Sequence, residues 1–320
     1  MKFVVRFIGI AIICGSLYYL GHRLSINLRE FANFELHWTT VLIACVGVLG
    51  YALALLLVVG AWGVLLSGAM TERPCWSDIL AIYGRSQVLK YIPSNVMHFA
   101  GRQVLGGKLG WPQLTIGTAS FLEIVVQIAA AALIAILLGW SDLGLLLPYV
   151  PPSLLVAVLP FVLLAMWFVL YIAPKIPTVK DRVRLPDFRD LAHGHHLPAA
   201  LSFQVAFQLC CGTLLWTLVA SVDGNWDWRE LPAICAAFSA AWVIGLISPG
   251  VSAGIGVREA ILVVLLGPIH GELTTMAATL AMRFVTTLGD LLLFGAALSV
   301  KGRVASDEVV QTTNVPTPRP

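Results

Sequence analysis

Two proline-containing breaks interrupt apolar sequence in this chain, one beginning at Pro93 and the other at Pro249. Each has an arginine nine positions after its proline, Arg102 in the first break and Arg258 in the second. A broken helix is costly in a bilayer, because backbone groups that leave their helical bonds must be satisfied by protein or water. An arginine at that depth is also costly and indicates a functional site. Two such breaks in the two halves of one chain are typical of a repeat-built membrane transporter with a central polar site.

The composition restricts the chain to the membrane class. Hydrophobic residues make up 58% of the sequence and charged residues 12%, and the mean hydropathy is +0.87. A soluble domain has about 25% charged residues. The six cysteines form no C-x-x-C pair, so neither a zinc site nor a disulfide framework is indicated. We expect no metal and no cofactor, and no nucleic-acid partner.

The apolar runs predict an all-α polytopic membrane protein with about six transmembrane helices and two re-entrant helical hairpins. Residues 1–303 form one membrane-embedded domain, and residues 304–320 form a disordered cytoplasmic tail. Each half of a hairpin is too short to span comfortably alone, since a crossing needs about 20 residues. The first hairpin is more polar than the second, so the alternative for it is a position partly in the membrane interface. The predicted spans are Phe3–Leu20, Trp38–Leu66, Leu114–Leu138, Leu154–Ile172, Ala199–Val222 and Thr274–Val300, and the predicted hairpins are Ile79–Leu109 and Leu231–Leu266.

The basic residues predict the orientation of this arrangement. Both termini, the base of the first hairpin and the 175–196 loop fall on one side, which carries twelve Lys and Arg residues against three on the other side. The positive-inside rule therefore places both termini in the cytoplasm, with the protein in the cytoplasmic membrane. Three spans separate the hairpins, so the hairpins open to opposite sides, as in an inverted repeat. The twelve are Lys2, Arg6, Arg73, Lys108, Lys175, Lys180, Arg182, Arg184, Arg189, Lys301, Arg303 and Arg319, and the three are Arg23, Arg29 and Arg229.

The second break has the chemistry of an anion site. Gly250, Gly254 and Gly256 permit unusual backbone angles and close approach of a ligand. A helix that begins after the break directs free N–H groups inward, and such an end attracts anions. The planar fork of Arg258 suits a phosphate. Gly101 and the arginine that follows it repeat the arrangement in the first break.

Further polar residues in the apolar helices complete the predicted binding site. Glu123 and Gln127 share a helical face, as do Arg283 and Asp290, seven positions apart. A structural role is the alternative: these residues pair with the two break arginines and hold the fold together. The predicted substrate-binding residues are Asn95, His98, Arg102, Glu123, Arg258, Glu259, Arg283 and Asp290, and none is predicted to be catalytic.

The residues around both breaks resemble the lysylphosphatidylglycerol synthase transmembrane-domain family, over nearly the whole chain. The resemblance depends on Lys90-Tyr91-Ile92-Pro93, on Gly101-Arg102, on the segment from Gly254 to Ala260 that contains Gly-Val-Arg-Glu, and on Glu123, Arg283 and Asp290. Ser94 stands where many members have glycine. The family includes the flippase half of the multiple peptide resistance factors. The resemblance implies lipid translocation, and we expect no lysyl transfer because the aminoacyl-transferase domain of the fused members is not in this sequence.

The sequence is therefore consistent with three candidate functions. The first is a flippase or transporter of a membrane lipid with an anionic headgroup, either a phospholipid or a polyprenyl-phosphate-linked lipid. The second is a membrane enzyme acting on a lipid phosphate, which would depend on His98 or Glu123. The third is a non-transporting subunit of a glycan- or lipid-assembly complex, in which Arg258 would be dispensable. The candidate protein partners are a second copy of the chain and a protein of glycan or lipid biosynthesis.

Overall fold

The computed structural model describes residues 38–70, 72–92, 97–139, 195–248 and 254–300, together with residues 18 and 22. All regular secondary structure in these ranges is helical. Five stretches are long and apolar enough to cross a membrane, namely α3, α6, α11, residues 228–247 and α14. The chain is therefore an all-helical, multi-pass membrane protein. The elements are α3 (Trp38–Ala69), α4 (Trp76–Gln87), η1 (Val88–Tyr91), α5 (Met97–Lys108), α6 (Gln113–Gly139), α11 (His196–Asp223), η4 (Trp228–Glu230), α12 (Leu231–Ile247), α13 (Val257–His270) and α14 (Glu272–Ser299).

Four of the six predicted spans are confirmed as long apolar helices, which are α3, α6, α11 and α14. The predicted spans Phe3–Leu20 and Leu154–Ile172, and the tail at 304–320, lie outside the described residues. The prediction that neither half of the second hairpin is long enough to cross alone is wrong for its first half. There η4 runs directly into α12 and gives a 20-residue apolar stretch. Pro232 favours this continuation, because proline suits the first turn of a helix.

Both predicted breaks are interruptions between helices. Before the first break the helical structure ends at Tyr91, and it resumes at Met97. At the second break α12 ends at Ile247 and α13 begins at Val257. The residues in the middle of the two breaks, among them Pro93, Asn95, Pro249 and Gly250, lie outside the described residues.

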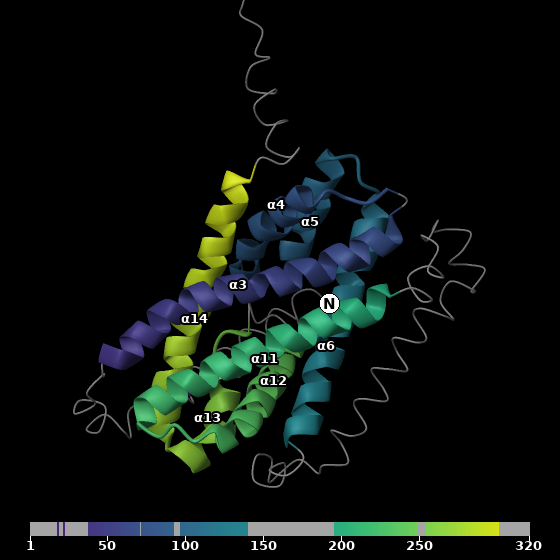
Figure 1. Cartoon of the computed structure of the whole chain (residues 1–320). Helices are drawn as coiled ribbons and strands as arrows, with labels where there is room; N and C mark the ends of the chain where they lie inside the picture. Colours follow the sequence, from purple (N-terminus) through teal and green to yellow (C-terminus); the bar gives the residue numbers. More distant parts are fainter. Residues whose placement is uncertain are drawn as a thin grey trace, which may run out of the picture.

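Two long antiparallel helices, α3 and α11, lie side by side across the front of the view in Figure 1. At one end of this pair, the Thr40 hydroxyl donates to the backbone oxygen of Ser221 over 3.2 Å. At the other end, Gly68 packs against the ring of His196. These contacts fix the two ends of the molecule, one near residues 40 and 221 and the other near residues 68 and 196.

The two broken helical segments lie toward opposite ends of the molecule, with α4 and α5 at the top of Figure 1 and α12 and α13 at the bottom. At the end of α13, the His270 imidazole lies 3.9 Å from the carboxylates of both Asp223 and Glu230. The outer ends of α12 and α13 therefore meet at the end of the molecule where α11 terminates. In the other segment, Gly101 of α5 packs against Ser86 and Leu89, so α5 folds back along the chain that precedes the break.

Glycines allow close helix packing, and Gly289 on α14 gives a test. A Cβ at Gly289 would lie 2.5 Å from a ring carbon of Tyr51 and 3.2 Å from the backbone oxygen of Val48, both on α3. We expect Gly289→Ala to destabilise the fold by about 1–3 kcal/mol, the usual cost of overpacking a close contact. Gly295→Ala is the matched control, since Gly295 lies on the same helix and a Cβ there meets nothing within 4 Å. Thermal unfolding of the purified variants measures the difference, and equal melting temperatures would contradict the close packing of α3 and α14.

Candidate functional site: a charged central cavity

A central cavity lies where the two broken segments meet α3, α6, α11 and α14. Its water-accessible volume is about 110 Å³, which is room for several water molecules, since one needs about 10–15 Å³ measured this way. Both break arginines line it, as do most of the residues predicted for a binding site. The charged residues and the histidine that line the central cavity are Lys90, His98, Arg102, Glu123, Arg258, Arg283 and Asp290.

The first break arginine is held in a buried ion pair. Arg102 of α5, 1% exposed, pairs with Glu123 of α6. The other carboxylate oxygen of Glu123 accepts a hydrogen bond from the Tyr83 hydroxyl over 2.6 Å. The guanidinium carbon also lies 3.8 Å from the centre of the Tyr83 ring and 5.3 Å from that of Trp62. Cation–π contacts of this kind add to the ion pair, so Arg102 is fixed by α3, α4 and α6 together.

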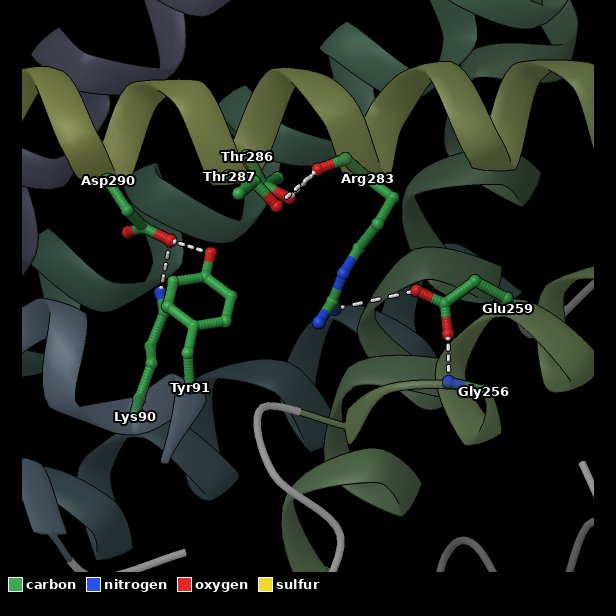
Figure 2. Close-up of polar contacts among 8 residues, drawn as sticks. All are labelled: Lys90, Tyr91, Gly256, Glu259, Arg283, Thr286, Thr287 and Asp290. Carbon is green, nitrogen blue, oxygen red and sulfur yellow. Dashed lines mark hydrogen bonds and ion pairs between the residues drawn. The ribbon is translucent and has the colours of Figure 1, made fainter. Parts of the chain in front are cut away.

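A second ion pair joins the first break to α14. Figure 2 shows Lys90 and Tyr91 of η1 both directed at the Asp290 carboxylate. The Lys90 ammonium lies 2.7 Å from Oδ2, and the Tyr91 hydroxyl donates to the same oxygen over 2.5 Å. Asp290 is fully buried, and its Oδ1 has no hydrogen-bond partner among the described residues. Oδ2 of Asp290 thus binds Lys90 and Tyr91 beside the first break, and Oδ1 can accept a hydrogen bond from a further donor.

A third ion pair joins the second break to the same helix. Glu259 accepts a hydrogen bond from the backbone N–H of Gly256 over 2.7 Å, and its other oxygen lies 3.5 Å from Arg283. Gly254 and Gly256 have φ angles of +68° and +84°, which a residue with a side chain adopts at a cost in strain. The glycines therefore turn the chain into α13, and the carboxylate caps its first turn.

The second break arginine has no such partner. Within the described ranges, no carboxylate lies within 4.0 Å of Arg258, and its buried Nε has no hydrogen-bond partner. Its guanidinium carbon lies 5.7 Å from the centre of the Trp242 ring, a cation–π contact. Gly245 on α12 lies beside Arg258, and a Cβ there would be 3.6 Å from the Arg258 Cβ and 3.8 Å from its Nε. Arg258 thus brings to the central cavity a positive charge that no described carboxylate pairs with directly.

The alternative in which both break arginines pair with carboxylates is therefore right for Arg102 and wrong for Arg258. Glu259, which follows Arg258 in sequence, pairs with Arg283 instead. Adjacent helical residues do not face the same neighbour, which is the physical reason for the error. Asp290 pairs with neither break arginine.

The remaining predicted residues are placed as follows. His98 lines the central cavity with its ring 3.8 Å from that of Phe99, and its buried Nδ1 has no hydrogen-bond partner in the described part of the chain. Gln127 lines the cavity one turn after Glu123. Gly101 packs at the first break, whereas Asn95 lies outside the described residues.

The sequence reasoning missed several residues of the site. In the sequence, Lys90 and Tyr91 stand out only as part of the Lys-Tyr-Ile-Pro motif, although a lysine in apolar sequence beside a break itself predicts a buried carboxylate partner. Tyr83 and Trp62 enclose Arg102. Aromatic residues are common in apolar helices, so nothing in the sequence distinguished these two from ordinary packing residues.

No family model matches the chain, and no curated protein matches it. The fold and the site together define an all-helical, multi-pass membrane protein with a charged cavity between two broken helical segments.

Proposed function

We propose that this protein is a flippase, which moves a lipid with an anionic headgroup across the cytoplasmic membrane without acting on it chemically. The lipid is a phospholipid or a polyprenyl-phosphate-linked lipid. The observation that carries the proposal is the central cavity, in which Arg258 is a cation with no carboxylate partner among the described residues. Arginine binds phosphate oxygens in a forked geometry and keeps its charge when buried.

The proposal includes an inverted repeat of two re-entrant hairpins, α4–η1–α5 and α12–α13. The positions of the two segments toward opposite ends of the molecule in Figure 1 support it. So does the meeting of the outer ends of α12 and α13 near Glu230 and His270. The excess of basic residues on one side supports cytoplasmic termini. We also propose membership of the lysylphosphatidylglycerol synthase transmembrane-domain family, on the residues that carry that resemblance.

An apolar groove between α3 and α11 supports a lipid as the substrate. Its water-accessible volume is about 670 Å³, and Leu42, Val46, Gly50 and Leu214 are among the residues that line it. Tyr51 lines both this groove and the central cavity. A lipid can therefore have its headgroup among the charges of the cavity while its chains remain in the groove and the bilayer.

The state of Glu123 argues against the enzyme alternative. One of its oxygens pairs with Arg102 and the other accepts the Tyr83 hydrogen bond. A general base must reach the proton that it removes from a substrate. Because both oxygens are engaged, Glu123 is better suited to holding Arg102 than to acid–base catalysis.

Reconstitution into vesicles tests the proposed function. Purified protein in liposomes that contain headgroup-labelled phosphatidylglycerol is expected to expose label from the inner leaflet to a membrane-impermeant quencher, faster than in protein-free liposomes. If the rates with and without protein are equal for phosphatidylglycerol and for polyprenyl-phosphate lipids, the flippase proposal is wrong.

Blocking the groove gives a more specific prediction. Gly50 is exposed, and a Cβ there meets nothing within 4 Å, so Gly50→Phe is expected to fold normally and to fill the groove. We expect a fall in the translocation rate on the order of tenfold or more, equivalent to about 1.4 kcal/mol in the barrier. Gly295→Phe is the control, because Gly295 is equally open and lies outside both the groove and the cavity. Equal rates in the two variants would show that lipid chains do not use the groove.

A further inference from the structure

We propose that the central cavity selects a headgroup with one net negative charge, that of a phosphodiester, over a diphosphate. This inference rests on the proposed function and narrows its substrate class. It follows from how charges are balanced around the cavity, and Figure 2 shows two of the ion pairs involved.

The cavity and its direct partners carry one more cation than carboxylates. Three cations are matched one to one, as Arg102 with Glu123, Lys90 with Asp290, and Arg283 with Glu259. The fourth cation is Arg258, which has no carboxylate within 4.0 Å among the described residues. With His98 counted as neutral, the surplus is one positive charge.

The residues between the broken helices do not alter this balance. Residues 93–96 are Pro, Ser, Asn and Val, and residues 249–253 are Pro, Gly, Val, Ser and Ala. None of these side chains titrates, so neither break adds a charge to the cavity. Among the described residues and these two short segments, the surplus therefore stays at one positive charge.

A surplus of one charge is matched best by a single negative charge. A buried charge is strongly disfavoured unless an opposite charge lies beside it. A phosphodiester placed against Arg258 neutralises the cavity and leaves the three ion pairs intact. A diphosphate would bring at least one further negative charge, and the other cations on the described cavity wall already have carboxylate partners.

Two buried polar atoms that have no hydrogen-bond partner in the described part of the chain, Nε of Arg258 and Oδ1 of Asp290, also fit a phosphodiester headgroup. The Nε atom of Arg258 is a donor with no acceptor in the described part of the chain, and a phosphate oxygen supplies one. Oδ1 of Asp290 is an acceptor with no donor there. A hydroxyl group attached to the phosphodiester, as in a glycerol headgroup, would supply that donor.

The charge rule, that the cavity prefers a headgroup with one negative charge over a diphosphate, can be tested by lipid binding, separately from transport. The probes are dioleoylglycerol, dioleoyl phosphatidylglycerol and dioleoylglycerol diphosphate, which share their chains and differ in headgroup charge. Binding to the purified full-length protein in detergent is measured with EDTA present, so that no divalent ion neutralises the diphosphate. We expect phosphatidylglycerol to bind on the order of tenfold more tightly than the diphosphate, and dioleoylglycerol to bind weakest. If the wild-type protein binds the diphosphate as tightly as phosphatidylglycerol or more tightly, the proposal is overturned.

Changing the surplus of positive charge in the cavity should change which of the two lipids, phosphatidylglycerol or the diphosphate, binds more tightly. Glu259→Gln raises the surplus to two positive charges, and the glutamine oxygen can still accept the Gly256 N–H bond. We expect this variant to bind the diphosphate at least as tightly as phosphatidylglycerol. Asp290→Asn also raises the surplus to two positive charges, by removing the partner of Lys90 instead. We expect the same gain in diphosphate binding, so this variant tests the proposal even if Glu259→Gln does not fold. An unchanged preference in a folded variant contradicts the charge rule. Normal preferences without any translocation would instead contradict the proposed function.

Discussion

The Arg258→Ala protein is expected to fold as the wild type does and to lose lipid translocation, with the rate falling to that of protein-free liposomes. Its stability should change by no more than about 1 kcal/mol, because the substitution removes one cation–π contact and leaves no carboxylate without a partner. The sequence alone predicts the same loss of translocation in a folded variant, but with some loss of stability, because Glu259 or another nearby carboxylate would lose its partner. In the structure Glu259 pairs with Arg283, so folding and transport separate in this variant.

Arg258→Lys is the control for charge. Lysine keeps the positive charge but lacks the planar fork that holds two phosphate oxygens, so we expect only a fraction of the wild-type rate. Thermal unfolding and the headgroup-accessibility assay are run on the same preparations. Wild-type transport by Arg258→Ala would mean that Arg258 is structural and that the proposed anion site at Arg258 is wrong.

Arg102→Ala is expected to have its main effect on stability. The substitution leaves the Glu123 carboxylate, 3% exposed, without its cation. Removing one partner of a buried ion pair costs about 3–5 kcal/mol. The variant should unfold at a much lower temperature than Arg258→Ala, although both remove an arginine from the same cavity.

A double variant separates loss of the ion pair from loss of the side chain's volume. Arg102→Leu combined with Glu123→Gln removes both charges and keeps an oxygen that can accept the Tyr83 hydrogen bond. Replacement of a whole buried pair by uncharged groups is often nearly neutral, so most of the stability should return. If the double variant is as unstable as Arg102→Ala, packing rather than charge pairing holds this part of the cavity.

The features set by local sequence could be predicted without the structure. Four of the spans follow from apolar length, and both helix interruptions follow from proline. The seven-residue spacing of Arg283 and Asp290 put them on one face of a helix, and both do line the central cavity. Seven residues of helix span about 10.5 Å, so the two side chains reach partners on different breaks.

The pairing of charges could not be predicted, because it depends on how the helices cross. Nothing in the sequence brings Lys90 to Asp290, which are 200 positions apart, or directs Glu259 away from Arg258. The continuous run of η4 into α12 was missed for a different reason. A polar segment at residues 223–230 reads as a loop, although its last three residues form a helical turn.

The lipid that stays bound to the purified protein tests the central claim most directly. Native mass spectrometry of the wild type and of Arg258→Ala, purified from the same cells, measures the mass and number of retained lipids per chain. We predict that the wild type retains a lipid with one phosphodiester and that Arg258→Ala loses it while remaining folded. Retention of the same lipid in the same amount by both proteins would contradict an anionic headgroup site at Arg258.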